Sequence, residues 1–242
     1  PFIQVPTTIL AHDSAVGGKT AINHPLGKNL IGAFYQPQIV IYDTNMLSTL
    51  PEVEIRSGMA EVVKHAMLSD EKWLQELLQI NYDQMTDEQL STYLAKGIQV
   101  KASIVEQDES EQSVRMFLNL GHTSGHALEA AAGYGKLTHG ECVMVGLIYM
   151  LLLCEDEGTI APAFTNEFIQ FVYNNNYPLH SLTHYPFEQL KQYMVKDKKA
   201  DYGELQFVLL QKIGVPFMKK IDLLTCERVD QILRQRITEV LR

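Results

Sequence analysis

At 242 residues the chain is long enough to bury a substantial core, either as one large domain or as two small ones. Apolar residues make up 46% and charged residues 20%, which is ordinary for a soluble globular protein. The formal net charge of -9 argues against nucleic-acid binding, because that binding depends on neutralising phosphates with basic side chains.

The first fifty residues contain short β-branched segments separated by loops that carry glycine and proline. The predicted strands are 2–5, 19–22 and 39–42, with loops around 17–18 and 25–27. Such strands are typical of the end of an α/β sheet. Because the first of them begins at the second residue, we expect that an N-terminal part of a longer protein precedes this chain.

From Pro51 onward the apolar residues recur with a helical period. Proline in a first turn with acidic residues beside it is typical of a helix start. The predicted helices are 51–67, 71–80, 86–106, 125–132, 141–157, 163–174, 187–195 and 226–241, and strands are predicted at 205–210 and 215–221. The predicted fold class is therefore an α/β remnant over 1–50, followed by a mainly α-helical domain over 51–242 with a small β-hairpin near 204–221.

The first candidates for chemistry are three histidines, His122, His126 and His139. If a helix begins at Ser124 or Gly125, the spacing of four places His122 and His126 on one face. They are then either metal ligands, with Glu129 or Glu141 added, or a buried hydrogen-bonded pair. Spacing alone does not choose the three groups that bind a metal.

Glu61 lies between Ala60 and Val62 on a predicted helix, so its side chain faces inward or borders the apolar stripe. An ionised carboxylate in that position is costly unless a cation or a metal ion lies beside it. The simpler interpretation is an exposed pair with Lys64 at i,i+3, which contributes little to stability.

Lys19 follows two glycines, and Lys28 and Asn29 follow a third. Glycine lets the backbone approach a phosphate or carboxylate, while lysine supplies charge. A Walker loop is excluded, because the pattern GxxxxGK[ST] requires glycine where Asp13 stands. Lys101 and the cluster 196–199 complete the cations, and a charge run such as this cluster is usually solvated surface.

The cysteines are odd in number and show no CxxC spacing, which is typical of reduced thiols in the cytoplasm. The longest apolar run, Val143 to Cys154, is much shorter than the roughly 20 residues of a membrane-spanning helix. We therefore expect a cytoplasmic protein with no membrane partner.

Taken together, these segments resemble the 3-dehydroquinate synthase family, which belongs to the sugar-phosphate cyclases. The matching segments are 6–8, 13–19, 23–34, 57–64, 115–126, 139–141 and 197–199. They occur in order along essentially the whole chain, which makes a chance match improbable. The segment between Thr8 and Asp13 is a residue shorter than in many members of the family.

The resemblance implies a specific set of site residues. The metal ion, zinc or cobalt, would be held by Glu61, His122 and His139, with His126 directed toward the substrate phosphate. The catalytic residues would be Asp13, Lys64 and Lys101, around the ring hydroxyls, and His126. The substrate carboxylate would meet Lys19, Arg115 and Asn119, and the phosphate would meet Asn29 and Lys198. The NAD contacts would be Thr7, Thr8, Lys19, Lys28 and Thr49.

The implied reaction converts 3-deoxy-D-arabino-heptulosonate 7-phosphate into 3-dehydroquinate and phosphate, a lyase step of the shikimate pathway in aromatic amino acid biosynthesis. NAD is regenerated within each turnover. The resemblance also implies a homodimer and a larger cofactor-binding part before the first residue. Since the chain contains no GxGxxG, we expect it to have little NAD affinity or activity on its own.

Three alternatives remain. Other sugar-phosphate cyclases share the metal ligands but act on substrates without this carboxylate, whereas Lys19, Arg115 and Asn119 favour a carboxylate. A related polyol dehydrogenase would release NADH. A metal-stabilised interaction module without catalysis would leave the clustered cations without a purpose.

Overall fold

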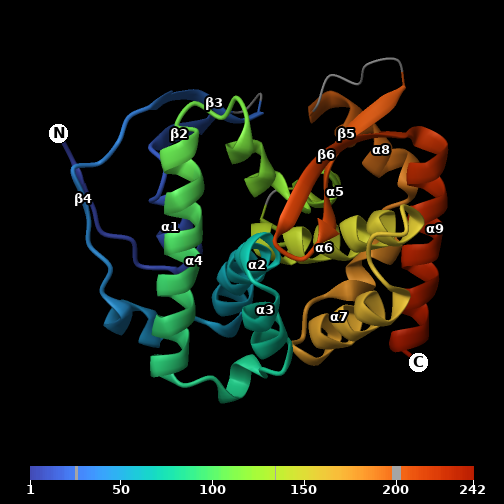
Figure 1. Ribbon diagram of the computed structural model, residues 1–242, viewed down its shortest axis with the longest axis horizontal. Coiled ribbons are helices and arrows are strands. Elements are labelled where there is room, and N and C mark those ends of the chain that lie inside the picture. Colours follow the sequence, from blue (N-terminus) through green and yellow to red (C-terminus); the bar gives the residue numbers. More distant parts are fainter. Residues whose placement is uncertain (25–26, 134, 198–202) are drawn as a thin grey trace.

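The computed structural model describes residues 1–24, 27–133, 135–197 and 203–242 (Figure 1). The helices are α1 (Ile9–Ser14), α2 (Glu52–Ser69), α3 (Glu71–Leu78), α4 (Asp87–Gln107), α5 (His122–Ala132), α6 (His139–Asp156), α7 (Pro162–Asn174), α8 (Phe187–Asp197) and α9 (Leu223–Val240). Short 3-10 helices are η1 (Thr44–Thr49), η2 (Tyr82–Gln84), η3 (Val114–Asn119) and η4 (Leu179–His184). The strands are β1 (Ile3–Gln4), β2 (Lys19–His24), β3 (Gly27–Phe34), β4 (Ile39–Val40), β5 (Glu204–Lys212) and β6 (Val215–Asp222).

The strands of the described segments form three two-stranded sheets. β1 and β4 are parallel, whereas β2–β3 and β5–β6 are antiparallel hairpins. Figure 1 shows the first two pairs beside α1 and α4 on one side of the molecule, and the β5–β6 hairpin above α6 on the other. Within the described ranges, no helix combines the length and apolarity that crossing a bilayer requires.

The first fifty residues contain more regular structure than predicted. Helix α1 begins after Thr8, whose side-chain oxygen accepts a hydrogen bond from the amide of Ala11 at 3.0 Å. The segment from Gly27 to Phe34 was not predicted as a strand, yet it is β3 and pairs with β2. Its glycines and polar residues give it a low intrinsic strand propensity, so the pairing itself decides its conformation.

Helices α5 and α6 both begin earlier than predicted. α5 begins at His122, because Gly121 adopts a φ of 75° that turns the chain into the helix. α6 begins at His139, because Thr138 and Glu141 form a capping box around its first turn. Each of these two helices therefore starts with a histidine.

Helix α6 is the centre of the hydrophobic core. Every residue from Gly140 to Cys154 is buried, and the helix contacts α2, α5, α7, α9 and β5. Two glycines of α6 allow the backbone of neighbouring segments to approach this helix closely. A Cβ on Gly140 would lie 1.8 Å from the carbonyl oxygen of Ser57 in α2, and a Cβ on Gly146 would lie 2.0 Å from that of Gly121. These contacts set how α2 and α5 sit against α6.

Candidate metal and substrate site

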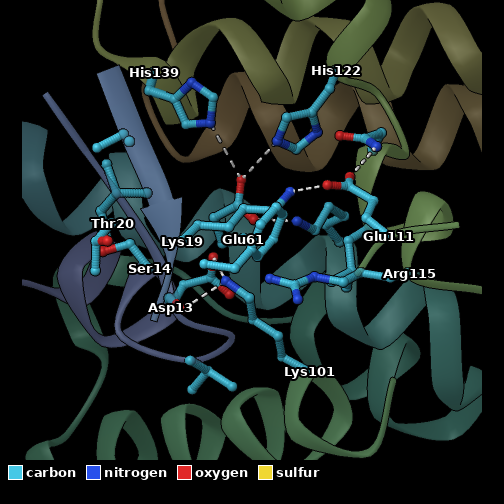
Figure 2. A pocket seen from close by; sticks show the side chains of 18 of the residues that line it. Asp13, Ser14, Lys19, Thr20, Glu61, Lys101, Glu111, Arg115, His122 and His139 are labelled. Atoms are coloured by element: carbon cyan, nitrogen blue, oxygen red, sulfur yellow. Dashed lines mark hydrogen bonds and ion pairs between the residues drawn. The ribbon is translucent and has the colours of Figure 1, made fainter. Parts of the chain in front are cut away.

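A cavity of about 700 Å³ lies between the N-terminal segments and the helices α2, α4, α5 and α6. It brings together most of the predicted site residues, namely Asp13, Lys19, Glu61, Lys64, Lys101, Arg115, Asn119, His122, His126 and His139. Figure 2 shows several of these side chains converging from the different elements.

Glu61 of α2 faces the two histidines that begin α5 and α6. Its Oε1 lies 3.6 Å from Nε2 of His122 and 3.7 Å from Nε2 of His139 (Figure 2). These separations are too long for hydrogen bonds, and Oε1 is buried without a hydrogen-bond partner. They are close to the roughly 3.4 Å between two ligand atoms of a tetrahedral zinc ion with bonds of about 2.1 Å. The three side chains therefore fit a metal ion.

A backbone carbonyl and a carboxylate orient the two imidazoles. Nδ1 of His122 lies 3.0 Å from the carbonyl oxygen of Leu120, and Nδ1 of His139 lies 3.3 Å from Oε2 of Glu129. Both partners are acceptors, so each Nδ1–H is directed to its partner and each Nε2 faces Glu61. Although burial lowers the pKa of His139, its contacts with Glu129 and Glu61 outweigh burial and raise that pKa to about 9. A metal ion must therefore displace a proton from this ring.

Lys64 forms a buried ion pair with the other oxygen of the Glu61 carboxylate. The simpler interpretation of an exposed pair is wrong, because each side chain is only 3% exposed. Burial acts to raise the pKa of Glu61, but the Lys64 ammonium and the imidazoles of His139 and His122 outweigh it and hold the pKa well below its usual range. Glu61 is therefore ionised and available as a ligand.

The sequence offered two further acids, Glu129 and Glu141, as possible metal ligands. The contacts of Glu141 are those of a helix cap. Its Oε2 accepts a hydrogen bond from the amide of Thr138 at 2.9 Å, and its Oε1 lies 3.6 Å from Arg56. Glu141 therefore caps α6, and it is not among the described residues that line the cavity.

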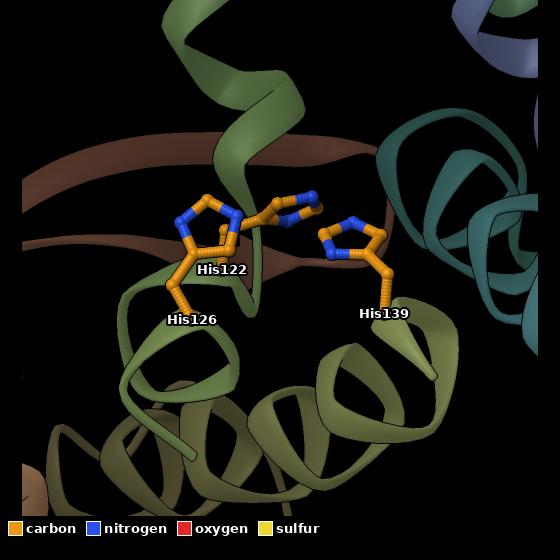
Figure 3. A group of neighbouring side chains, drawn as sticks. All are labelled: His122, His126 and His139. Carbon is orange, nitrogen blue, oxygen red and sulfur yellow. The ribbon is translucent and has the colours of Figure 1, made fainter. Parts of the chain in front are cut away.

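His126 lies one turn after His122 on the same face of α5, as the spacing predicted. Its ring centroid is 5.1 Å from that of His122 and 5.6 Å from that of His139 (Figure 3). The three imidazoles each offer a nitrogen within 4.8 Å of the others, so they form an alternative set of ligands. The unpartnered Glu61 oxygen, directed at His122 and His139, favours the set that contains the carboxylate.

Asp13 is held between two buried side chains. Nζ of Lys101 lies 2.7 Å from Oδ2 of Asp13, and Nε2 of His65 lies 3.3 Å from Oδ1. Burial lowers the pKa of His65 to about 4, so this imidazole is neutral near pH 7. The sequence did not single out His65, although its position four residues after Glu61 places it on the same helix face.

In the same cavity, two of the residues predicted to bind the substrate carboxylate contact a carboxylate of the chain itself. Lys19 forms an ion pair with Oε2 of Glu111, and Nδ2 of Asn119 donates to Oε1 of Glu111 at 3.1 Å (Figure 2). Glu111 has a φ of 59°, a left-handed conformation that glutamate rarely adopts. Nothing in the sequence pattern predicted this residue.

Arg115 forms part of the cavity wall and is only 1% exposed. Its Nη2 donates to the carbonyl oxygen of Gly17 at 2.7 Å, and its Nη1 donates to that of Glu109. The guanidinium therefore joins the turn before β2 to the segment before η3.

The residues predicted to contact NAD or phosphate are only partly described. Thr8 caps α1, and Thr49 ends η1, while Thr7 precedes the cap. These threonines lie outside the set of described residues that line the cavity. Lys28 and Asn29 belong to β3, but their side chains are outside the described part of the structure, as is the whole of Lys198.

Comparison of the sequence with known proteins shows the family to which the chain belongs. The family model for the N-terminal part of 3-dehydroquinate synthase matches residues 1–57, and the model for its C-terminal part matches 58–200. A 3-dehydroquinate synthase from Lysinibacillus sphaericus (strain C3-41) is 62% identical over the whole chain. The chain belongs to the 3-dehydroquinate synthase family.

The matched relatives are longer than this chain. It spans 67% of the Lysinibacillus sphaericus relative and 59% of the 3-dehydroquinate synthase from Bacillus pumilus (strain SAFR-032), which is 52% identical over 88% of the chain. The family assignment confirms the resemblance seen in the sequence. That residues 1–50 belong to a nucleotide-binding domain stays a prediction.

Two solved structures share the fold of this 3-dehydroquinate synthase family member. A 2-deoxy-scyllo-inosose synthase, solved with carbaglucose-6-phosphate, NAD+ and Co2+, has a TM-score of 0.80 and 28% identity over 96% of this chain and 66% of its own. A 2-epi-5-epi-valiolone synthase from Streptomyces hygroscopicus subsp. jinggangensis 5008, with NAD+ and Zn2+, has a TM-score of 0.79 and 20% identity over 99% of this chain and 66% of its own. The fold is therefore that of the sugar-phosphate cyclases.

Proposed function

We propose that this chain is the metal- and substrate-binding part of a 3-dehydroquinate synthase. The full-length enzyme would convert 3-deoxy-D-arabino-heptulosonate 7-phosphate into 3-dehydroquinate and phosphate with NAD and a divalent metal. The observation that carries the proposal is the unpartnered Oε1 of Glu61, which faces the Nε2 atoms of His122 and His139 at 3.6 and 3.7 Å. The names of the two curated relatives described above support the same activity.

Glu61, His122 and His139 would hold the ion, Zn2+ or Co2+, and leave coordination positions open for substrate hydroxyls. When bound, such an ion polarises an alcohol oxygen and lowers its pKa, which assists removal of hydride by NAD. Lys64 keeps the Glu61 carboxylate ionised and in place. The buried pair of Asp13 and Lys101 offers an acceptor and a donor to neighbouring hydroxyls.

The substrate phosphate would approach His126, which lies in the same cavity one helical turn from His122. An imidazole there can donate a hydrogen bond to the leaving phosphate and assist that phosphate in taking the proton from the carbon next to the new ketone, so that the C–H bond and the C–O bond to phosphate break together with formation of the double bond. Asn29 and Lys198 complete the proposed phosphate contacts, and Thr7, Thr8, Lys19, Lys28 and Thr49 the proposed NAD contacts.

The pair formed by Lys19 and Asn119 supports a carboxylate-bearing substrate. These side chains hold the carboxylate of Glu111, which serves as a stand-in for the carboxylate of the substrate. The two side chains can therefore bind a carboxylate within this cavity. The same observation therefore favours dehydroquinate over the inosose and valiolone skeletons.

One prediction follows from this stand-in. Glu111→Gln in the full-length enzyme removes an internal anion that competes for Lys19 and Asn119. We expect the KM for the carboxylate substrate to fall about two- to fivefold, the range that a partly exposed ion pair allows, with kcat unchanged. Steady-state kinetics with Glu109→Gln as the control, from the same segment, measure this. A rise in KM means instead that Glu111 helps to bind the substrate.

The function itself is tested with the full-length protein, 3-deoxy-D-arabino-heptulosonate 7-phosphate, NAD and Co2+ or Zn2+. We expect 3-dehydroquinate and phosphate in equal amounts, with no accumulation of NADH in the absorbance of the reduced nicotinamide. Accumulating NADH would identify a polyol dehydrogenase. Turnover of only carboxylate-free sugar phosphates would identify another cyclase.

Location and assembly belong to the same proposal. All three cysteines, Cys142, Cys154 and Cys226, are buried thiols, which supports a reducing, cytoplasmic compartment. A homodimer is proposed from the family resemblance alone.

A further inference from the structure

Glu129 is a buried carboxylate for which the proposed reaction supplies no role. It lies on α5 and is 6% exposed. Its Oε2 is 3.3 Å from Nδ1 of His139, the first residue of α6. A carboxylate so far from water is costly unless a specific partner offsets the loss of hydration. Its position against His139 therefore requires an explanation.

The position of Glu129 on the His139 ring shows that it is not itself a ligand of the proposed site. Glu129 contacts Nδ1, whereas Glu61 faces Nε2 of the same ring. The two nitrogens of an imidazole point in different directions, so the carboxylates of Glu129 and Glu61 lie on opposite sides of His139. This separates Glu129 from the ligand set.

His122 and His139 differ in what holds their Nδ1 atoms. The backbone carbonyl of Leu120 holds His122, and no side-chain substitution removes it. His139 depends on the side chain of Glu129, and its own side chain is 24% exposed, more than the 11% of His122. His139 is thus the ligand whose orientation requires a dedicated partner.

We propose that Glu129 is a positioning residue for the metal site, which holds the Nδ1–H of His139 so that Nε2 is aimed at the ion. The proposal rests on the metal site proposed above. A carboxylate in this position also makes the imidazole a stronger donor to a metal, which raises affinity. The packing of α5 on α6 supplies this alignment, since Glu129 and His122 both come from α5 and His139 begins α6.

The test is Co2+ binding by the full-length apoprotein, followed by calorimetry and by the visible absorption of the bound Co2+. Glu129→Gln keeps an oxygen that can accept from Nδ1–H but loses the charge, and we expect roughly tenfold weaker binding. Glu129→Leu removes the acceptor, and we expect roughly 100-fold weaker binding with a changed Co2+ spectrum. Glu155→Gln is the matched control, because it removes a carboxylate paired with Arg236 elsewhere on α6.

The outcomes separate the positioning role from the site itself. Weaker binding and an altered spectrum in the Glu129 variants, with the control unchanged, support the proposal. Unchanged Co2+ affinity and spectrum in Glu129→Gln and Glu129→Leu overturn it, even if thermal stability falls. Should Glu129→Leu fail to fold, the Glu129→Gln result decides. If Glu61→Gln also leaves Co2+ affinity unchanged, the ligand set that contains Glu61 is wrong, which is a different failure.

Discussion

Glu61→Gln in the full-length enzyme is expected to reduce metal-dependent turnover by at least about 10³-fold, because Lewis-acid assistance from a metal amounts to several kcal/mol. The amide oxygen is a weak metal ligand, and the substitution also leaves the Lys64 ammonium buried without its counter-ion. Both effects remove the ion from between His122 and His139. Turnover at saturating substrate and Co2+ affinity by calorimetry measure the loss.

The control for this substitution is Glu52→Gln. Glu52 lies in the first turn of the same helix, and its side chain is 79% exposed. The chemical change is identical, but we expect turnover and Co2+ affinity to stay at the level of the unmodified enzyme. Near-normal turnover in Glu61→Gln would falsify its role as a ligand and favour the set of three histidines.

Gly140→Ala is expected to lower the free energy of unfolding by at least about 3 kcal/mol, the upper part of the range for overpacked interiors. The added Cβ would lie 1.8 Å from the carbonyl oxygen of Ser57, so α2 and α6 must separate. The hydrogen bond from the amide of Gly140 to Oγ of Ser57, 3.2 Å long, would be lost with that contact. Because Glu61 and His139 belong to these two helices, Co2+ binding should weaken as well.

Denaturant unfolding followed by circular dichroism measures the effect of Gly140→Ala. The control is Gly97→Ala in α4, where the nearest atom to the added Cβ is Nδ1 of His65 at 3.3 Å. At that position the higher helix propensity of alanine offsets the cost of the tight contact. We therefore expect the free energy of unfolding of Gly97→Ala to change by no more than about 1 kcal/mol. Equal stability of the two alanine variants contradicts the proposed backbone contact.

Most helices could be predicted from the sequence, because their apolar residues follow the helical period and their ends carry proline, glycine or capping residues. The start of α6 was predicted too late, at Glu141, whereas the helix begins at His139. The pattern Thr138-x-x-Glu141 is a capping-box signature, and its use would have placed His139 at the first helical position. β3 was missed for a different reason, since only its partner strand stabilises an extended conformation there.

The site itself depends on contacts that no local pattern contains. The ion pair of Asp13 and Lys101 joins residues 88 apart in the chain, and that of Lys19 and Glu111 joins residues 92 apart. The family resemblance implied Asp13, Lys19 and Lys101 but was silent on Glu111. Residue types in a motif predict chemistry, whereas the choice of counter-ion is made by the tertiary fold.

The burial of α6 has a consequence for the walls of the cavity. With every residue from Gly140 to Cys154 enclosed, this helix has no free side and acts as a fixed frame that carries His139. The opposite wall of the cavity comes from α1 and the β2–β3 hairpin, where Ile22 and Phe34 are 63% and 55% exposed. The cavity therefore has one wall anchored in the hydrophobic core, which carries His139, and a facing wall built from surface elements of this chain.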